Sequence, residues 1–173
     1  MITINELTVS YGENVVLKNL NVRFSPGKIH GILGVNGAGK STFFNTVYGT
    51  KKADRGVVMY NENVLDKRNI GFLQTENFFY PLMKGKEYLQ LVAPKKDYQK
   101  WNDIFQLPLN EFVEDYSTGM KKKIAFMGLI LLDRNVYILD EPFNGVDLQS
   151  NEILISIIPV SYTHLTLPTI LLV

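Results

Sequence analysis

The chain has 173 residues, of which 46% are hydrophobic and 20% charged, and its formal net charge is +1. This composition is typical of one soluble globular domain, and the near-neutral charge excludes the strong field that attracts nucleic acid or an anionic membrane. The chain has no cysteine, which excludes disulfides and cysteine-ligated zinc. It shows no signal-peptide core and no apolar run of 18 residues, so we expect any role at a membrane to act through a partner.

The N-terminal half alternates strand and helix signals. Apolar and polar residues alternate over residues 2–12 and 16–24, which predicts two strands, with Ile2, Ile4, Leu7 and Val9 inward. The short apolar run at 28–34 predicts a buried parallel strand. We expect a helix to follow and to stop at Gly49, and further strands at 55–64 and 69–74.

The second half begins with a more polar, helical region. Helical patterns at 85–93 and 97–107 predict a small insert, for which we set limits of about 75–118. A helix over 117–134 follows, with Ser117 or Thr118 as its N-cap and a core face made of Ile124, Met127 and Leu131. A buried strand at 135–142 and a helix at 147–158 complete the pattern. Strands that alternate with helices predict an α/β fold with a parallel sheet.

The segment "GVNGAGKST", residues 34–42, matches the pattern G-x-x-x-x-G-K-[ST] of a phosphate-binding loop. Glycines let the backbone curl so that successive N–H groups point at one phosphate, and the following helix adds its positive N-terminal end. Lys40 can reach the β- and γ-phosphates, and the Ser41 hydroxyl can ligate Mg²⁺. We therefore assign nucleotide binding to Asn36, Gly37, Ala38, Gly39, Lys40, Ser41 and Thr42.

Two carboxylates, Asp140 and Glu141, follow the apolar run "VYIL". The carboxyl ends of parallel strands form the edge at which ligands bind in open α/β sheets. At this edge Asp140 is a candidate Mg²⁺ ligand, directly or through water, and Glu141 is a candidate base that polarises an attacking water. The alternative is a solvated acidic pair at the end of a strand.

Between these motifs lies "DYSTGMKKK", residues 115–123, which resembles the signature motif of ATP-binding-cassette (ABC) ATPases. Ser117 and Gly119 match the signature, while Tyr116, Thr118 and Met120 stand in place of its Leu, Gly and Gln. The resemblance covers residues 2–158. It implies a P-loop NTPase core with a parallel sheet, an N-terminal antiparallel β subdomain and a small helical insert.

The resemblance also assigns roles to three further residues. Tyr11 stands where the family has an adenine-stacking aromatic residue, although a tyrosine that only packs within its strand is the alternative. Gln74 stands where the family has a glutamine that contacts Mg²⁺ and water, with a plain polar strand end as the alternative. Asp147, in "NGVD", resembles the D-loop at the dimer interface.

As mechanism, the resemblance implies ATP and Mg²⁺ as ligands and a second ABC ATPase domain as partner, in a homo- or heterodimer. Each ATP would lie between the phosphate loop of one domain and Ser117, Thr118, Gly119 and Met120 of the other. Transmembrane permease subunits would hold the protein at the cytoplasmic face of the cell membrane, and no nucleic acid is expected.

Two other features allow two interpretations each. The lysines at 121–123 read mainly as a solvated helix face, and otherwise as electrostatic help to ATP. The apolar cluster of Phe78, Phe79, Tyr80, Leu82 and Met83 is either the insert's own core or a docking groove for a permease subunit. We expect Asp at Phe79 or Tyr80 to uncouple transport and leave nucleotide binding intact.

The last stretch, "SIIPVSYTHLTLPTILLV", does not fit the family pattern. A switch histidine should end one more parallel strand, but His164 follows Asp140 too closely for a helix, a turn and a returning strand, and Pro159 interrupts the helix. Val160–Thr169 instead resembles one reading frame of a transposase adapter used in sequencing libraries. Our hypothesis is that the native sequence stops near Ile158, that residues 159–173 are a non-native tail, and that one or more C-terminal strands are missing.

We therefore interpret residues 1–158 as the nucleotide-binding domain of an ATP hydrolase that powers a bacterial ABC transporter, an exporter by its Tyr-Ser-Thr-Gly-Met signature. One alternative is a soluble ABC ATPase that acts on ribosomes or DNA. Another is an ATP-binding module with little hydrolysis, which we expect of the truncated 173-residue chain.

Overall fold

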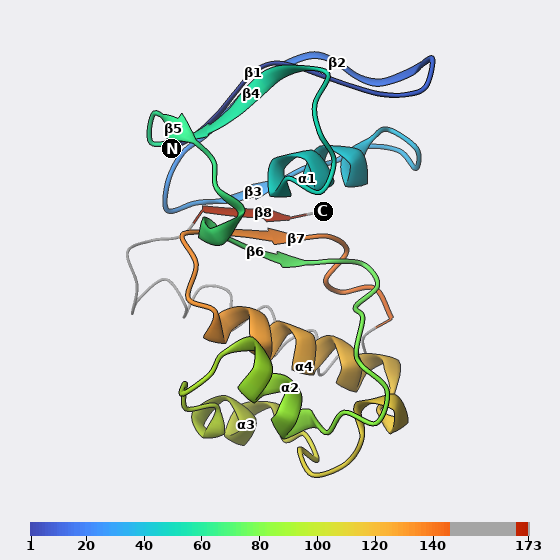
Figure 1. Cartoon of the computed structure of the whole chain (residues 1–173), viewed down its shortest axis with the longest axis vertical. Coiled ribbons are helices and arrows are strands. Elements are labelled where there is room, and N and C mark those ends of the chain that lie inside the picture. Colours follow the sequence, from blue (N-terminus) through green and yellow to red (C-terminus); the bar gives the residue numbers. More distant parts are fainter. Residues whose placement is uncertain (146–168, 173) are drawn as a thin grey trace. The chain divides into compact units, whose positions relative to one another are not determined.

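The structure is a computed structural model in which residues 1–145 and 169–172 are described (Figure 1). The chain divides into two compact units. The first, here the phosphate-loop unit, contains residues 1–72, 134–140 and the C-terminal strand. The second, the helical unit, contains residues 73–133 and, among the described residues that follow residue 140, residues 141–145. The expected α/β class is confirmed, with one antiparallel and one parallel sheet.

The antiparallel sheet of the phosphate-loop unit has the order β2-β1-β4-β5. Its two long strands, β1 (Ile2–Tyr11) and β2 (Asn14–Phe24), form a hairpin. Two shorter strands, β4 (Arg55–Tyr60) and β5 (Asn63–Val64), extend the sheet from the other edge of β1. The alternating patterns of the sequence predicted these strands.

A bulge in β1 shifts the phase of the buried residues. Ile2, Ile4, Leu7 and Val9 are all fully buried, although a strict period of two would turn Leu7 and Val9 to the other face. The shift occurs at Glu6, whose φ is +51°, and the β1–β2 register is irregular there. The amide of Glu6 leaves the ladder and donates to Asn21 Oδ1 at 2.9 Å.

Helix α1 (Lys40–Tyr48) lies between the two sheets of the phosphate-loop unit (Figure 1). Phe43, Phe44 and Val47 bury their side chains in a core that includes residues from β1, β2, β6 and β7. The Phe43 ring lies 6.3 Å from that of Phe24 in β2. The helix ends at Gly49, as predicted, and this glycine has the left-handed φ of +89° that favours it at a C-cap.

The second sheet has the order β3-β8-β7-β6. Strands β3 (Ile29–Gly31) and β7 (Val136–Leu139) both pair in parallel with β8 (Thr169–Leu172), and β6 (Ile70–Leu73) follows η1 (Lys67–Asn69). The predicted strand at 28–34 is therefore shorter than expected. All four residues of β7 are buried, as expected for a central strand.

The sequence predicts that one or more C-terminal strands of the parallel sheet are missing. This prediction is wrong for the place between β3 and β7, where a strand is present. Thr169–Leu172 forms β8, which fills the place between β3 and β7. Residues 160–168, which carry most of the adapter-like sequence, and the helix predicted at 147–158 lie outside the described residues.

The helical unit contains α2 (Gly85–Val92), α3 (Gln99–Phe105), η2 (Val113–Asp115) and α4 (Thr118–Leu131). Helices α2 and α4 pack on each other, and Phe105 of α3 lies edge-on to Phe126 of α4 at 6.3 Å between ring centroids. The predicted core face of α4 is confirmed, since Ile124, Met127 and Leu131 are buried.

The bulge in β1 gives a test of the antiparallel sheet. At Gly56 φ is +85°, and an added Cβ would lie 2.5 Å from the Asn5 carbonyl oxygen. We expect Gly56→Ala to lower the free energy of unfolding by about 3 kcal/mol, from backbone strain plus overpacking. The matched control is Gly49→Ala, at φ +89° with no atom near the added Cβ, for which we expect about 1 kcal/mol. Urea unfolding measures both, and equal losses would show that the close approach carries no energy.

Candidate functional site

The loop between β3 and α1 has the backbone that its glycines predicted. Gly37 and Gly39 have left-handed φ values of +82° and +90°, and Gly39 is the N-cap of α1. A Cβ on Gly39 would lie 2.9 Å from Val16 Cγ1, so only glycine lets the loop lie against β2. Around Gly37 an added Cβ would meet no atom, which leaves this side of the loop open to a ligand.

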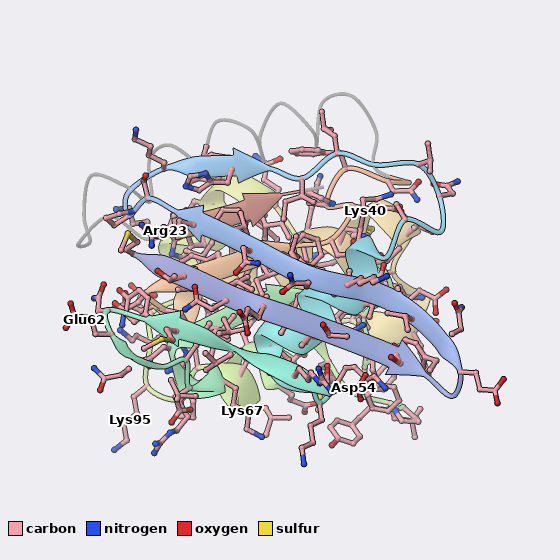
Figure 2. All side chains as sticks on the ribbon, turned by 90° about the horizontal axis from the view of Figure 1, so that it is seen from above. Arg23, Lys40, Asp54, Glu62, Lys67 and Lys95 are labelled. Carbon is pink, nitrogen blue, oxygen red and sulfur yellow. The ribbon has the colours of Figure 1, made fainter. Side chains whose placement is uncertain are left out.

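Lys40 folds back over the same loop. Its Nζ donates to the carbonyl oxygens of Gly34, at 2.8 Å, and Val35, at 3.2 Å. Figure 2 shows Lys40 at the start of α1. The first N–H groups of α1 have no acceptor within the helix, so the ammonium and the positive helix end together favour an anion at the loop.

Asp140 lies at the same edge of the parallel sheet. Gly31 and Leu139 both pair with Leu172, so two strand spacings, about 10 Å, separate the ends of β3 and β7. The Asp140 side chain is only 6% exposed, and no donor among the described residues bonds its carboxylate. A buried carboxylate without a hydrogen-bond donor is a natural cation ligand.

The donors at this edge fit Mg²⁺. The described residues contain no cluster of three or more acidic or histidine side chains that could enclose a metal. Mg²⁺ needs no such cluster, since it is usually held by one or two carboxylates together with substrate phosphates and water. Asp140 and the exposed hydroxyl of Ser41, which follows the loop, are hard oxygen donors of the kind it prefers.

Tyr11, the predicted adenine platform, is the last residue of β1 and is 52% exposed. The ammonium of Lys51 lies 4.1 Å from the centroid of its ring, a cation–π contact. The ring is therefore not packed into the core, and its role toward adenine stays a prediction.

Gln74 directly follows β6 and lies near the start of the helical unit. It is exposed, and its carbonyl oxygen accepts a hydrogen bond from Asn77 Nδ2 at 3.3 Å. Among the described residues its side-chain amide has no hydrogen-bond partner. The predicted contact of Gln74 with Mg²⁺ and water stays a prediction.

The signature segment starts α4 as the sequence predicted. Ser117 is the N-cap, and its Oγ accepts a hydrogen bond from the amide of Met120 at 3.2 Å. Because the hydroxyl caps the helix as an acceptor, its own proton can still be donated to a ligand. Thr118 is exposed and Gly119 partly so, which leaves this helix end accessible. Tyr116 is buried, donates to the Pro108 carbonyl at 2.8 Å, and has a pKa raised by this burial to about 12.

One of the three lysines that follow is not on a solvated face. Lys122 is only 5% exposed, and its Nζ donates to the backbone carbonyl of Glu141 at 3.2 Å. Lys121 fits the prediction better, since it is partly exposed and bonds the Glu114 carbonyl. The helical period did not reveal Lys122 because it lies off the apolar face of Ile124 and Met127.

Glu141 has a second partner that the sequence did not indicate. Its Oε2 accepts a hydrogen bond from Asn144 Nδ2 at 3.0 Å, and the Asn144 amide donates to the Glu141 carbonyl at 3.2 Å. The spacing of Asn144 from the carboxylate pair was the one available signal, since asparagine readily bonds residues a turn away. Asp147, the predicted D-loop residue, and His164, which the sequence analysis rejected as the switch histidine, lie outside the described residues.

Comparisons with known proteins agree with this geometry. The family model described as ABC transporter matches residues 17–144. The chain is 30% identical to an uncharacterized ABC transporter ATP-binding protein, YhaQ, of Bacillus subtilis over 89% of this chain and 56% of that protein. It is 32% identical to the bacitracin transport ATP-binding protein BcrA of Enterococcus faecalis, over 85% and 52%. The ribosome protection protein VmlR of Bacillus subtilis is 31% identical, over 86% and 27%.

Solved structures show the same fold. An ATP-binding subunit of an ABC transporter superposes with a TM-score of 0.89 at 24% identity, covering 99% of this chain and 78% of that one. A dimeric bacterial ABC transporter cassette, MJ0796, superposes with a TM-score of 0.84 at 22% identity, covering 99% and 88%. The chain spans 56% of the length of YhaQ and 52% of that of BcrA. Since the family model covers most of the sequence, the chain belongs to the ATP-binding-cassette (ABC) transporter family.

Proposed function

We propose that the chain is the nucleotide-binding part of an ATPase subunit that powers a bacterial ABC transporter. The carrying observation is the phosphate loop, in which Lys40 and the free end of α1 favour an anion. Asp140, buried and without a donor among the described residues, ends β7 at the same sheet edge. An anion site beside a cation ligand is what a magnesium nucleotide needs.

The residues divide the work of hydrolysis. Lys40 and the loop amides would hold the β- and γ-phosphates, while Ser41 and Asp140 would hold Mg²⁺, which neutralises phosphate charge when bound. Glu141 would accept a proton from the attacking water, and Gln74 would help to orient that water. Tyr11 would stack on the adenine.

Head-to-tail dimerisation would complete the site. The capped, accessible start of α4, with Ser117 and Gly119, offers an N-terminal helix end to the γ-phosphate of a second domain. A dimeric cassette among the solved structures of this fold supports the arrangement. We propose the Tyr-Ser-Thr-Gly-Met signature as that of an exporter, and BcrA, a relative named for bacitracin transport, agrees with a transport role.

Permease subunits would dock on the helical unit. The structure divides the predicted apolar cluster, because Phe78 and Tyr80 are 77% and 59% exposed and lie edge-on to each other at 5.3 Å, with Leu82 exposed as well. Phe79 instead packs edge-on to Tyr88 of α2 at 5.1 Å. We propose Phe78, Tyr80 and Leu82 as the docking surface. None of the helices within residues 1–145 has the length and apolar character of a membrane span. Docking on permease subunits would place the protein at the cytoplasmic face of a membrane.

Removing the loop ammonium tests nucleotide binding. Lys40→Ala should weaken the binding of a fluorescent ATP analogue about 10- to 100-fold, because charged hydrogen bonds to phosphate each contribute about 1.5–3 kcal/mol. Lys52→Ala, which removes an exposed lysine of the same unit, should change the Kd less than twofold. Equal Kd values for the two variants would contradict the proposed function.

Asp140→Asn separates metal binding from stability. With Mg²⁺ present, we expect the variant to lose the increase in ATP affinity that the metal gives the parent chain. Without metal its free energy of unfolding should fall by no more than about 0.5 kcal/mol, since no described donor pairs with the carboxylate. Isothermal titration with and without Mg²⁺ measures the first effect and urea unfolding the second, with the exposed Asp54→Asn as control. A large loss of metal-free stability would make Asp140 structural.

The divided cluster predicts different outcomes for neighbouring residues. Tyr80→Asp should abolish co-purification with the permease subunits and leave ATP affinity and stability unchanged, because its ring lies on the surface. Phe79→Asp should lower the free energy of unfolding by about 2 kcal/mol, since it removes the ring contact with Tyr88 and places a charge at a half-buried position. Retained co-purification of Tyr80→Asp would rule out this docking surface.

A role on the ribosome is the second candidate, because VmlR is a relative over most of this chain. It predicts ATP-dependent co-sedimentation with ribosomes. The transporter proposal instead predicts co-purification with membrane subunits from the same cells.

A further inference from the structure

The contact between Lys122 and Glu141 joins α4, the helix that begins in the signature segment, to the proposed catalytic base. Lys122 is a buried lysine near the start of α4, and its ammonium donates to the Glu141 backbone carbonyl at 3.2 Å. Burying an ammonium is unfavourable unless it is bonded, so loss of the bond to the Glu141 carbonyl would cost free energy.

The partner is a residue in an uncommon conformation. Glu141 has φ of +49°, a left-handed value that residues other than glycine adopt uncommonly. Its carbonyl accepts both Lys122 Nζ and the Asn144 amide, and its carboxylate accepts Asn144 Nδ2. The direction in which the Glu141 carboxylate points therefore depends on the turn at residues 141–144, and Lys122 bonds the first residue of that turn.

The start of α4 also touches the other end of this turn. Gly145 has φ of +73°, and a Cβ on it would lie 3.2 Å from Thr118 Cγ2. Thr118 and Lys122 are one helical turn apart, so one face of α4 contacts both ends of the segment 141–145. The same first turn carries Ser117 and Gly119, which we propose to meet the γ-phosphate of a second domain.

We propose that Lys122 is a positioning residue that holds Glu141 in its hydrolytic orientation and transmits the state of the signature helix to it. The proposal rests on the function proposed for Glu141 and the signature segment. A nucleotide bound at the start of α4 would change the hydrolytic competence of the adjoining site through Lys122, without any contact of its own with Glu141.

Lys122→Met tests the tie, because it keeps the length of the side chain and removes the ammonium. Lys121→Met is the matched control, since Lys121 also bonds a backbone carbonyl, that of Glu114, away from Glu141. We expect Lys122→Met to lower kcat at least about tenfold, as for a misplaced catalytic group, with KM and the Kd of ATP changed less than twofold. Lys121→Met should leave all three within twofold, and Lys122→Arg should recover most of kcat.

A second readout does not depend on turnover. Amide hydrogen exchange of residues 143–145 should be about tenfold faster in Lys122→Met than in the parent chain or in Lys121→Met. If the parent chain binds no ATP, the proposed function is wrong. The exchange rates alone then decide whether the bond from Lys122 stabilises the turn that begins at Glu141. If Lys122→Met does not fold, Lys122→Gln, which is too short to reach the carbonyl, should give the same two changes. Unchanged exchange, or kcat and ATP affinity that fall together, would overturn the proposal.

Discussion

The burial of α1 is the constraint on which the rest of the phosphate-loop unit depends. Phe43, Phe44 and Val47 are packed from both sides, and each buried side chain of this size contributes about 1.5–3 kcal/mol. A helix held in this way cannot rotate or slide, so its N-terminal end is fixed in place. The phosphate loop is held in place at its end by Gly39, which is the N-cap of α1 and lies against β2.

The register of the parallel sheet fixes the position of Asp140. Because β3 and β7 end level with each other, the loop and the carboxylate share one edge, although more than half of the chain lies between them in sequence. The backbone of the sheet sets this distance, and no contact between the two groups is required. An anion site and a buried carboxylate can thus be held apart until a ligand joins them.

Much of this could be predicted from the sequence, for physical reasons that particular residues show. The glycines of the loop and the apolar run before Asp140 determine the structure of their own segments. The sequence pattern was therefore enough to predict the loop and the buried strand. The burial of Lys122 could not be predicted, because its partner is a distant backbone carbonyl that leaves no trace in the helical period. The division of the aromatic cluster between Tyr80 and Phe79 likewise depends on Tyr88, which only the packing of α2 brings near.

The place that β8 occupies has a consequence for what can fill it. Both of its neighbours pair with it through backbone groups, in parallel register over a few residues. Main-chain pairing of this kind asks for an extended, apolar, β-branched segment and is tolerant of its identity. The slot between β3 and β7 therefore selects for a physical type of peptide rather than for one sequence. The pairing that completes the sheet therefore depends on the backbone of the strand and not on one particular sequence.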